Sequence, residues 1–203
     1  NKHHFSKMIN MTHFSSSKYD LNNILGGILF SYKEEDGKKI FEIATTDGNR
    51  LSNYEYELEE QAGKLEQAEV VVPAKVILDV QKIIESSVDD DICISFLNNQ
   101  IIFFTQDRFI VSRLIEGSYP RYKQLIPDNQ DKLAQVNTKQ FISCLERVAT
   151  MANEITNLVK LTFKDNKLFV ESSNQDYGQA ADDMAIHYEG DEISIFLPDF
   201  NFS

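Results

Sequence analysis

Apolar side chains recur with helical spacing in three segments of the 203-residue chain. The first segment covers about residues 3–14, the second follows Pro73, and the third covers about residues 138–152. In the first, the positions i, i+3, i+4 and i+7 that share one helix face are Phe5, Met8, Ile9 and Thr12. Proline suits the first turn of a helix, so the second helix is predicted to start there. The pattern predicts three amphipathic helices.

Short runs of alternating apolar and polar residues follow each predicted helix and are typical of strands. Turn residues such as Asp-Gly and Asn-Asn separate the runs and favour hairpins. The predicted strands are 24–32, 38–46 and 51–58, then 91–96, 100–105 and 108–114, then 158–163, 167–172 and 178–188. Two further runs, 68–73 and 133–137, precede the second and third helices. Alternation implies that each strand buries one face.

The order strand, helix, three strands therefore occurs three times, at intervals of about 65–70 residues. This repeat predicts an α+β fold in which helices cover one face of antiparallel sheets. The stretch "YPRYKQLIPDNQD" (119–131), with two prolines and a polar end, indicates a domain boundary. We predict one domain over 1–128 and an incomplete second domain over 129–203. The chain begins without Met and stops on "DFNFS", so we expect a piece of a longer protein.

Charge is distributed unevenly along the chain. The three predicted helices, taken as 2–14, 73–86 and 138–152, carry six basic and three acidic residues, a net charge of +3. Because the whole chain carries −12, the remainder carries −15. Basic helices in an acidic protein suggest that one surface meets a polyanion. Solvated helix faces are the plainer interpretation. Neither a recognition-helix pattern nor a stacking platform is present, so any contact with nucleic acid is expected through phosphates, without sequence preference.

Catalytic and metal-binding patterns are missing from the sequence. The cluster Asp89–Asp91 lies in a turn directly before a strand, and Asp182–Asp183 interrupts a predicted strand. Both are predicted to be solvated turns, because metal-dependent chemistry needs carboxylates that converge from separate elements. The histidines and the two cysteines, Cys93 and Cys144, fit no ligand spacing, and the cysteines are expected to be free thiols in a reducing cytoplasm. No membrane span, signal peptide, P-loop or nucleophile elbow is recognised. We expect neither an enzyme nor a cofactor.

Five motifs in one order carry a resemblance to a known family. They are "ILGGILF" (24–30), "ATTDGNRL" (44–51), "VVVPAKVILDVQKII" (70–84), "SRLIEGSYPRYKQLIP" (112–127) and "ATMANEITNLVKLTF" (149–163). The chain resembles the bacterial DNA polymerase III β subunits, the sliding clamps, over their middle domain and part of their C-terminal domain. The resemblance covers almost the whole chain. It implies a DNA-clamp (processivity) fold.

The resemblance implies a scaffold without an active site. Family members form a head-to-tail dimeric ring of six similar domains, with helices around the hole and sheets outside. The ring encircles duplex DNA and tethers the replicative polymerase. The implied partners are double-stranded DNA, the DNA polymerase III α subunit, the clamp loader and repair proteins, which dock through short linear motifs. The family's first domain is not found here, so this chain is not expected to close a ring.

The resemblance also implies two sets of site residues. Positions on the helices that face DNA match Lys7, Lys75, Lys82 and Arg147. The cleft that takes partner peptides matches Leu25, Thr46, Gly48, Arg50, Leu51, Pro120 and Leu125. A small apolar cleft with few polar groups suits the Leu and Phe anchors of an extended peptide. Without the resemblance, Leu25, Pro120 and Leu125 would be interpreted as ordinary core residues. No metal site is implied.

Three functions remain under consideration. The first is a non-enzymatic processivity clamp, located in the cytoplasm at the replisome. The second is a clamp-like adaptor that binds peptides without encircling DNA. The third is an enzyme that uses Asp89–Asp91, and it would require a metal held by converging carboxylates. The first two differ in whether the basic helices form a continuous concave surface.

Overall fold

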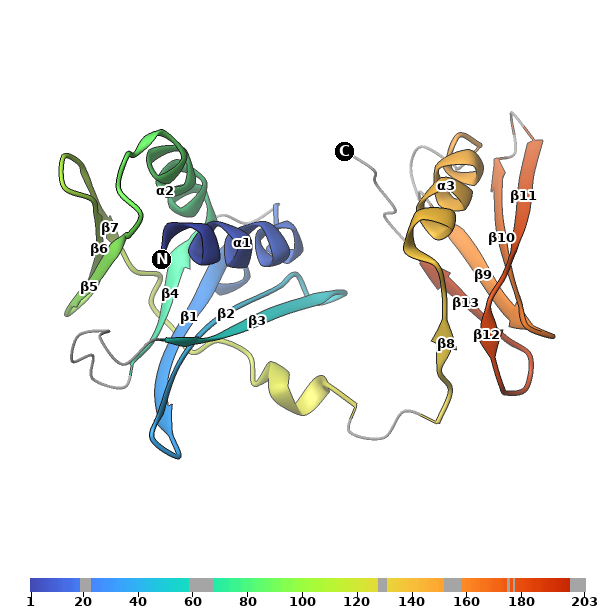
Figure 1. The fold of residues 1–203 in the computed structure, drawn as a ribbon, viewed down its shortest axis with the longest axis horizontal. Helices are drawn as coiled ribbons and strands as arrows, with labels where there is room; N and C mark the ends of the chain where they lie inside the picture. The colour runs from blue at the N-terminus through green and yellow to red at the C-terminus, as the bar shows by residue number, and fades with distance from the viewer. Residues whose placement is uncertain are drawn as a thin grey trace. The chain divides into compact units, whose positions relative to one another are not determined.

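The structure is a computed structural model, and it describes residues 1–18, 23–58, 68–127, 131–151, 158–174, 176 and 178–197. The chain divides into two compact units, Asn1–Leu125 and Ile126–Ser203, which are described separately below (Figure 1). The predicted border at 128/129 between family domains stays a prediction. Within the described residues, no helix is long and apolar enough to cross a membrane.

A four-stranded antiparallel sheet forms the centre of the first unit. Its strands are β1 (Gly27–Glu35), β2 (Lys38–Thr46), β3 (Leu51–Leu58) and β4 (Ala68–Pro73), in the order β3-β2-β1-β4. Helix α1 (Lys2–Thr12), followed by the 3-10 turn η1 (His13–Ser15), lies across β2 and β3 (Figure 1). The Asn1 side chain accepts a hydrogen bond from the His3 N–H and so caps α1. The helix therefore covers one face of this sheet.

The second half of the first unit repeats the helix and the strands. Helix α2 (Ala74–Ser86) leads to a three-stranded sheet of β5 (Cys93–Leu97), β6 (Gln100–Phe104) and β7 (Phe109–Arg113). The two helices lie side by side, where the Gln81 side-chain amide donates to Asn10 Oδ1 at 2.7 Å. One buried core joins both halves, and the ring of Phe30 makes edge-on contacts there with Phe5, Phe41 and Phe103.

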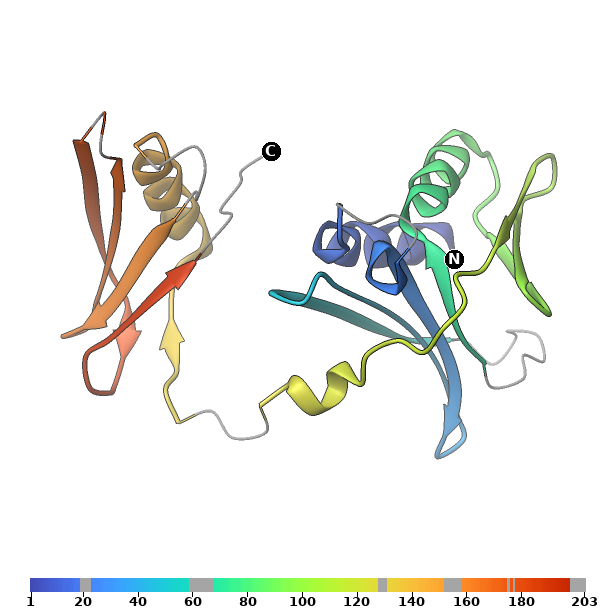
Figure 2. The ribbon, with the colours of Figure 1, turned by 180° about the vertical axis from the view of Figure 1, so that it is seen from behind.

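The chain after β7 crosses the sheet face that α1 leaves uncovered. The Ile115 N–H donates to the Val71 carbonyl at 2.8 Å, which fixes the start of this passage beside β4. Residues 119–125, called the crossing segment below, continue over the sheet and end in the 3-10 turn η3 (Tyr122–Leu125) (Figure 2). A second apolar cluster forms beneath it from Leu29, Ala44, Val71, Tyr119 and Tyr122. The sheet is therefore buried on both faces.

The second unit has the same design. Strand β8 (Ala134–Gln135) precedes α3 (Thr138–Ala149), whose first turn is capped by the Asn137 side chain. Strands β9 (Val159–Lys164), β10 (Lys167–Asn174), β11 (Gly178–Ala185) and β13 (Ile193–Leu197) form a sheet in the order β11-β10-β9-β13. Helix α3 packs on β10 and β11, and β8 pairs with the short β12 (His187–Tyr188). The buried face of α3 consists of Cys144, Leu145 and Val148.

Alternation predicted β2, β3 and β4 with the bounds that the structure has. Three expectations were wrong. Residues 24–26 form a 3-10 turn, η2 (Ile24–Gly26), before β1 begins. The run 178–188 forms two strands, β11 and β12, which belong to different sheets and are separated by Ile186. Asp182 and Asp183 lie inside β11 and are not a turn.

Strand β13 was not predicted at all. It pairs with β9 as β4 pairs with β1. In both four-stranded sheets, a later strand therefore forms the edge next to the first of the three hairpin strands. Helices on one face of antiparallel sheets therefore recur in both units.

Candidate functional site: the 46–51 turn, the crossing segment and the basic helices

The turn between β2 and β3 is ordered by its first residue, Asp47. One carboxylate oxygen accepts the N–H groups of Asn49 and Arg50 at 3.0 and 3.1 Å, and the other accepts Arg50 Nε at 3.0 Å. Partial burial by itself raises the pKa of Asp47, but these hydrogen bonds and the Arg50 charge outweigh it, so the pKa lies below its ordinary value. Gly48 supplies a φ of +93°, a conformation that side chains disfavour.

Thr46 fixes both ends of this turn. Its hydroxyl donates to the Arg50 carbonyl at 2.7 Å and accepts the Gly48 N–H at 3.1 Å. Its own N–H donates to the hydroxyl of Tyr119 in the crossing segment at 2.9 Å. Because the Thr46 side chain is buried and its hydroxyl is occupied within the turn, Thr46 shapes the surface and offers little of itself to a ligand.

Arg50 and Leu51 are the parts of the turn that reach the surface. The Arg50 side chain is 44% exposed although it pairs with Asp47. Leu51 is half-buried and packs against the cluster of Tyr119 and Tyr122. A guanidinium and an isobutyl group thus lie next to each other in the sequence at the start of β3. The isobutyl group can contact an apolar anchor of a ligand, and the guanidinium can bind a polar group of it.

The crossing segment supplies the other predicted residues. Pro120 is exposed between Tyr119 and Tyr122, both of which are buried. Leu125 is 73% exposed at the end of η3. Leu25 lies in η2, half-buried, and its carbonyl accepts the Ser17 N–H at 2.9 Å. In the part of the chain that is described, Leu51 joins the Tyr119–Tyr122 cluster, whereas Leu25 and Leu125 stay outside it.

The structure therefore brings Thr46, Gly48, Arg50, Leu51 and Pro120 together through the Thr46–Tyr119 hydrogen bond. Sequence reasoning missed the residues beneath them, namely Glu42, Asn53, Tyr119, Tyr122 and Lys123. Two signals could have found them: a lone glutamate inside the apolar run "IFEIAT", and two tyrosines three positions apart around Pro120. The assignment of this surface as a peptide cleft stays a prediction.

The predicted DNA-facing lysines lie on the surface of α1 and α2. The ammonium of Lys7 lies 5.7 Å from the ring centre of Tyr54 on β3, a cation–π distance. Lys82 pairs with Asp79 at 3.1 Å, and both side chains are largely exposed. Lys75 is exposed, and no carboxylate of the described residues pairs with it. The same helices also expose Met11 and Leu78.

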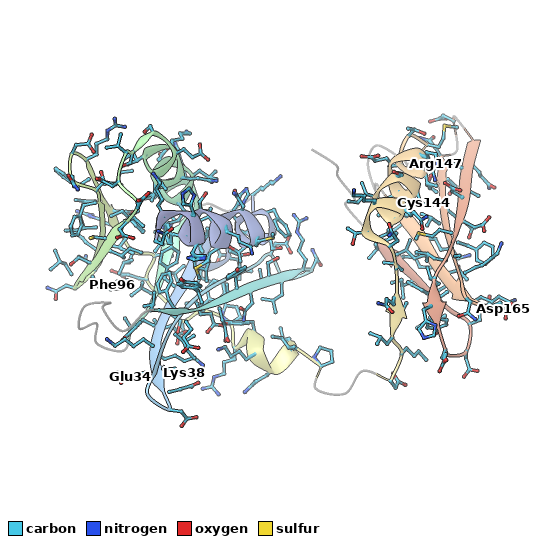
Figure 3. All side chains as sticks on the ribbon, viewed as in Figure 1. Glu34, Lys38, Phe96, Cys144, Arg147 and Asp165 are labelled. Atoms are coloured by element: carbon cyan, nitrogen blue, oxygen red, sulfur yellow. The ribbon has the colours of Figure 1, made fainter. Side chains whose placement is uncertain are left out.

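Arg147 on α3 is paired with a strand residue. Its Nε donates to Asp182 Oδ2 on β11 at 2.6 Å, and this bond leads the causes that hold the pKa of Asp182 below its usual value. Figure 3 labels Arg147 and the neighbouring Cys144 on α3. Burial, followed by the negative charge of Asp182, raises the pKa of the Cys144 thiol to about 11. The Arg147 charge is therefore partly neutralised within its own unit.

The acidic clusters have structural partners. Asp89 Oδ2 accepts the Gln106 N–H at 2.9 Å and lies 3.3 Å from the Ser87 hydroxyl, so it joins the turn after α2 to the β6–β7 loop. Asp183 pairs with Lys167 at 2.9 Å across the β10–β11 hairpin. Within the described ranges, no three His, Cys, Asp or Glu side chains come together in a way that could hold a metal.

Comparison with known proteins gives a family for both units. Residues 1–121 match the central domain of the DNA polymerase III beta subunit, and residues 123–202 match its C-terminal domain. The beta sliding clamp of Rickettsia bellii is 32% identical over 179 residues, and that of Haemophilus influenzae is 26% identical over 189. These alignments cover 87% and 93% of the chain but 45% and 50% of the relatives. The chain thus spans about half the length of these relatives.

A solved sliding clamp from Bartonella birtlesii, bound to griselimycin, has the same fold. It superposes with a TM-score of 0.87 at 27% identity and covers 97% of this chain and 52% of its own. The matches confirm the resemblance carried by the five motifs. They also agree with the expectation that the chain is no enzyme, since the relatives carry the name of the clamp subunit.

Proposed function

Because the chain belongs to the family of the DNA polymerase III beta subunit, we propose that it is part of a sliding clamp. In this function the whole protein is a homodimeric ring that surrounds duplex DNA and tethers the replicative polymerase. It works at the replisome in the cytoplasm and performs no chemistry itself. The observation that carries the proposal is the match of both units, in order, to consecutive domains of one clamp subunit.

Contact with DNA is proposed through Lys7, Lys75, Lys82 and Arg147. All four side chains are exposed, and all lie on the helices of the fold. Such contacts neutralise phosphates without reading bases, so the affinity should fall steeply with salt. An acidic remainder would keep the rest of the protein away from the DNA.

Partner recruitment is proposed at the surface formed by Leu25, Thr46, Gly48, Arg50, Leu51, Pro120 and Leu125. Exposed Pro120 and Leu125 and half-exposed Leu51 offer apolar contacts, while Arg50 offers a charge. An extended peptide with leucine and phenylalanine anchors fits this chemistry. The polymerase α subunit, the clamp loader and repair proteins would carry such motifs. The griselimycin-bound relative from Bartonella shows that a member of the family binds a ligand.

Topological retention on DNA tests the clamp proposal. The full-length protein that contains this chain is loaded onto nicked circular DNA and onto the same DNA after linearisation, and both are passed over a gel-filtration column in high salt. A ring should stay on the circle and slide off the linear form, because encirclement needs no strong contact. Equal retention on both forms would argue against encirclement.

A second candidate is a clamp-like adaptor that binds peptides without surrounding DNA. Two ion pairs favour it: Lys82 and Arg147 are already bonded to Asp79 and Asp182, which lowers the free positive charge on α2 and α3. The exposed apolar side chains of Met11 on α1 and Leu78 on α2 also favour the adaptor. The adaptor would bind a partner peptide normally and would be lost equally from circular and linear DNA.

A further inference from the structure

A buried carboxylate lies between the sheet and the crossing segment, outside the set of predicted site residues. Glu42 is on β2, on the same sheet face as Ala44 and Thr46, and its side chain is 1% exposed. Asp and Glu are almost never fully buried unless they are paired. A charge at this position therefore calls for a physical reason.

Three side chains satisfy the Glu42 carboxylate. Asn53 Nδ2 on β3 donates to Oε1 at 2.8 Å, and the hydroxyl of Tyr122 donates to the same oxygen. Lys123 Nζ donates to Oε2 at 2.7 Å and also lies 3.4 Å from Glu55 Oε1. Two of the three donors thus come from the crossing segment, about 80 residues further along the chain.

Apolar packing alone does not set the position of the crossing segment. The rings of Tyr119 and Tyr122 meet edge-on with centres 6.5 Å apart and pack on Leu29, Ala44 and Val71. Such contacts hold the segment on the sheet, but the hydrophobic effect has no direction and does not by itself specify the position of the segment along the sheet. Hydrogen bonds to a buried charge are directional and strong, so the bonds from Tyr122 and Lys123 to Glu42 fix its register.

The same segment is bonded to the turn at its other end, through the Thr46 N–H and the Tyr119 hydroxyl. Pro120 lies between the two anchor points, and Leu125 closes the 3-10 turn that begins at Tyr122. The distance from Leu51 to Pro120 and Leu125 therefore depends on both anchors. Loss of either anchor would leave the ligand-facing residues present but badly spaced.

We propose that Glu42 is a positioning residue of the peptide-docking surface, which holds Pro120 and Leu125 in place relative to Leu51 through Tyr122 and Lys123. It touches no ligand itself. The inference rests on the proposed docking function, and it adds a residue that sets the geometry of the site from beneath. Burial and the Glu42 bond raise the pKa of the Tyr122 hydroxyl, in keeping with a proton kept on the tyrosine.

Glu42→Gln tests this role in the 203-residue chain. The amide keeps the size of the side chain but removes the charge that Lys123 and Tyr122 share. Tyr122→Phe is the second variant, because it keeps the ring in the apolar cluster and removes only the hydroxyl. Glu55→Gln is the matched control, since it takes the exposed partner from Lys123 and leaves the buried one. Ile84→Val, on the buried face of α2, controls for a general loss of stability.

Two readouts are measured on each variant. The first is amide hydrogen exchange by NMR at Thr46, Tyr122 and Gln124, whose N–H groups report on the anchored segment. The second is the Kd of a Gln-Leu-x-Leu-Phe peptide. We expect Glu42→Gln and Tyr122→Phe to speed exchange at these three amides and to raise the Kd roughly tenfold. Glu55→Gln and Ile84→Val should change the Kd less than twofold.

The outcomes separate this inference from the docking function on which it rests. Unchanged exchange in Glu42→Gln overturns the role of Glu42 as an anchor. Faster exchange with an unchanged Kd, while Leu51→Ala weakens the peptide, overturns its role in docking and leaves the docking function intact. An equal rise in Kd in Ile84→Val means that Glu42 acts only through overall stability, which also overturns the proposal. Absence of any peptide binding by the parent chain refutes the docking function, and this inference with it.

Discussion

The backbone N–H of Thr46 donates a hydrogen bond to the hydroxyl of Tyr119, which is 73 positions away in the sequence, at 2.9 Å. Both groups are buried. This bond joins the turn after β2 to the segment that crosses the sheet. Most residues of the proposed docking surface are therefore arranged around one tyrosine hydroxyl.

Removal of that hydroxyl should destabilise the first unit. Tyr119→Phe leaves the buried Thr46 N–H without an acceptor, which should lower the free energy of unfolding by about 1–3 kcal/mol. Urea unfolding followed by circular dichroism measures the change. Tyr56→Phe is the control, because in the described structure the Tyr56 hydroxyl makes no hydrogen bond, and it should have little effect. A stability for Tyr119→Phe equal to that of the parent would contradict the importance of the bond.

Tyr119 and Tyr122 should make the protein sensitive to alkali. Burial raises the pKa of Tyr119 to about 12, and burial together with Glu42 raises the pKa of Tyr122. Both ionise at about pH 10 when unfolded. Since the folded state then keeps protons that the unfolded state loses, each tyrosine lowers the free energy of unfolding by about 1.4 kcal/mol per pH unit above about pH 10.

Urea unfolding between pH 8 and 11.5 measures this slope. These two groups add no pH dependence below about pH 10, so the free energy of unfolding should begin to fall there and continue to fall toward pH 12. Tyr122→Phe should reduce the slope of the free energy of unfolding against pH by the contribution of one tyrosine. The same slope in the variant and the parent would show that Tyr122 ionises normally.

Leu51 should be the apolar anchor point of the docking surface. Leu51→Ala removes part of the half-buried side chain and should weaken the Gln-Leu-x-Leu-Phe peptide by roughly ten- to a hundredfold, as truncation of a central interface residue does. Isothermal titration calorimetry measures the affinity. Leu97→Ala serves as the control, because Leu97 is an exposed leucine on β5 outside the predicted surface. Unchanged affinity in Leu51→Ala would remove Leu51 from the proposed site.

The two thiols should react at very different rates. Cys93 is exposed on β5, whereas Cys144 is fully buried on α3 with its pKa raised to about 11. Because the thiolate is the reactive form, a disulfide reagent at pH 8 should modify one thiol quickly and the second only after denaturation. Cys93→Ser should abolish the fast phase. A remaining fast phase in that variant would place Cys144 at the surface.

The Arg147–Asp182 pair offers a test of the proposed DNA-facing surface. Asp182→Asn removes the carboxylate that neutralises Arg147, so the affinity of the 203-residue chain for duplex DNA in low salt should rise several-fold. Asp183→Asn is the matched control, because it removes the same charge one residue away, where the partner is Lys167. Fluorescence anisotropy measures both. Equal effects of the two variants would indicate a general change in net charge and would argue against Arg147 as a DNA contact.

Much of the local structure could be predicted from the sequence. Alternation over 38–46, 51–58 and 68–73 predicted three strands with the bounds that the structure has, because side chains of period two report directly on a half-buried strand. The helices were recognised from apolar side chains at i, i+3, i+4 and i+7, which share one face of a helix. The run 178–188 was interpreted as one strand because nothing in its composition shows that β11 ends at Ala185 and that His187 begins a strand of another sheet.

By itself, the sequence determined most of the elements, the threefold repeat and, through five motifs, the family. Only the tertiary structure decided which strands share a sheet, as β13 and β4 show, and why a glutamate can be buried at position 42. Local sequence patterns show whether a side chain is polar, but they do not show which residues it contacts in the fold. The partners of Glu42 on the crossing segment lie about 80 residues away, and the fold alone brings the Tyr122 hydroxyl and the Lys123 ammonium to its carboxylate.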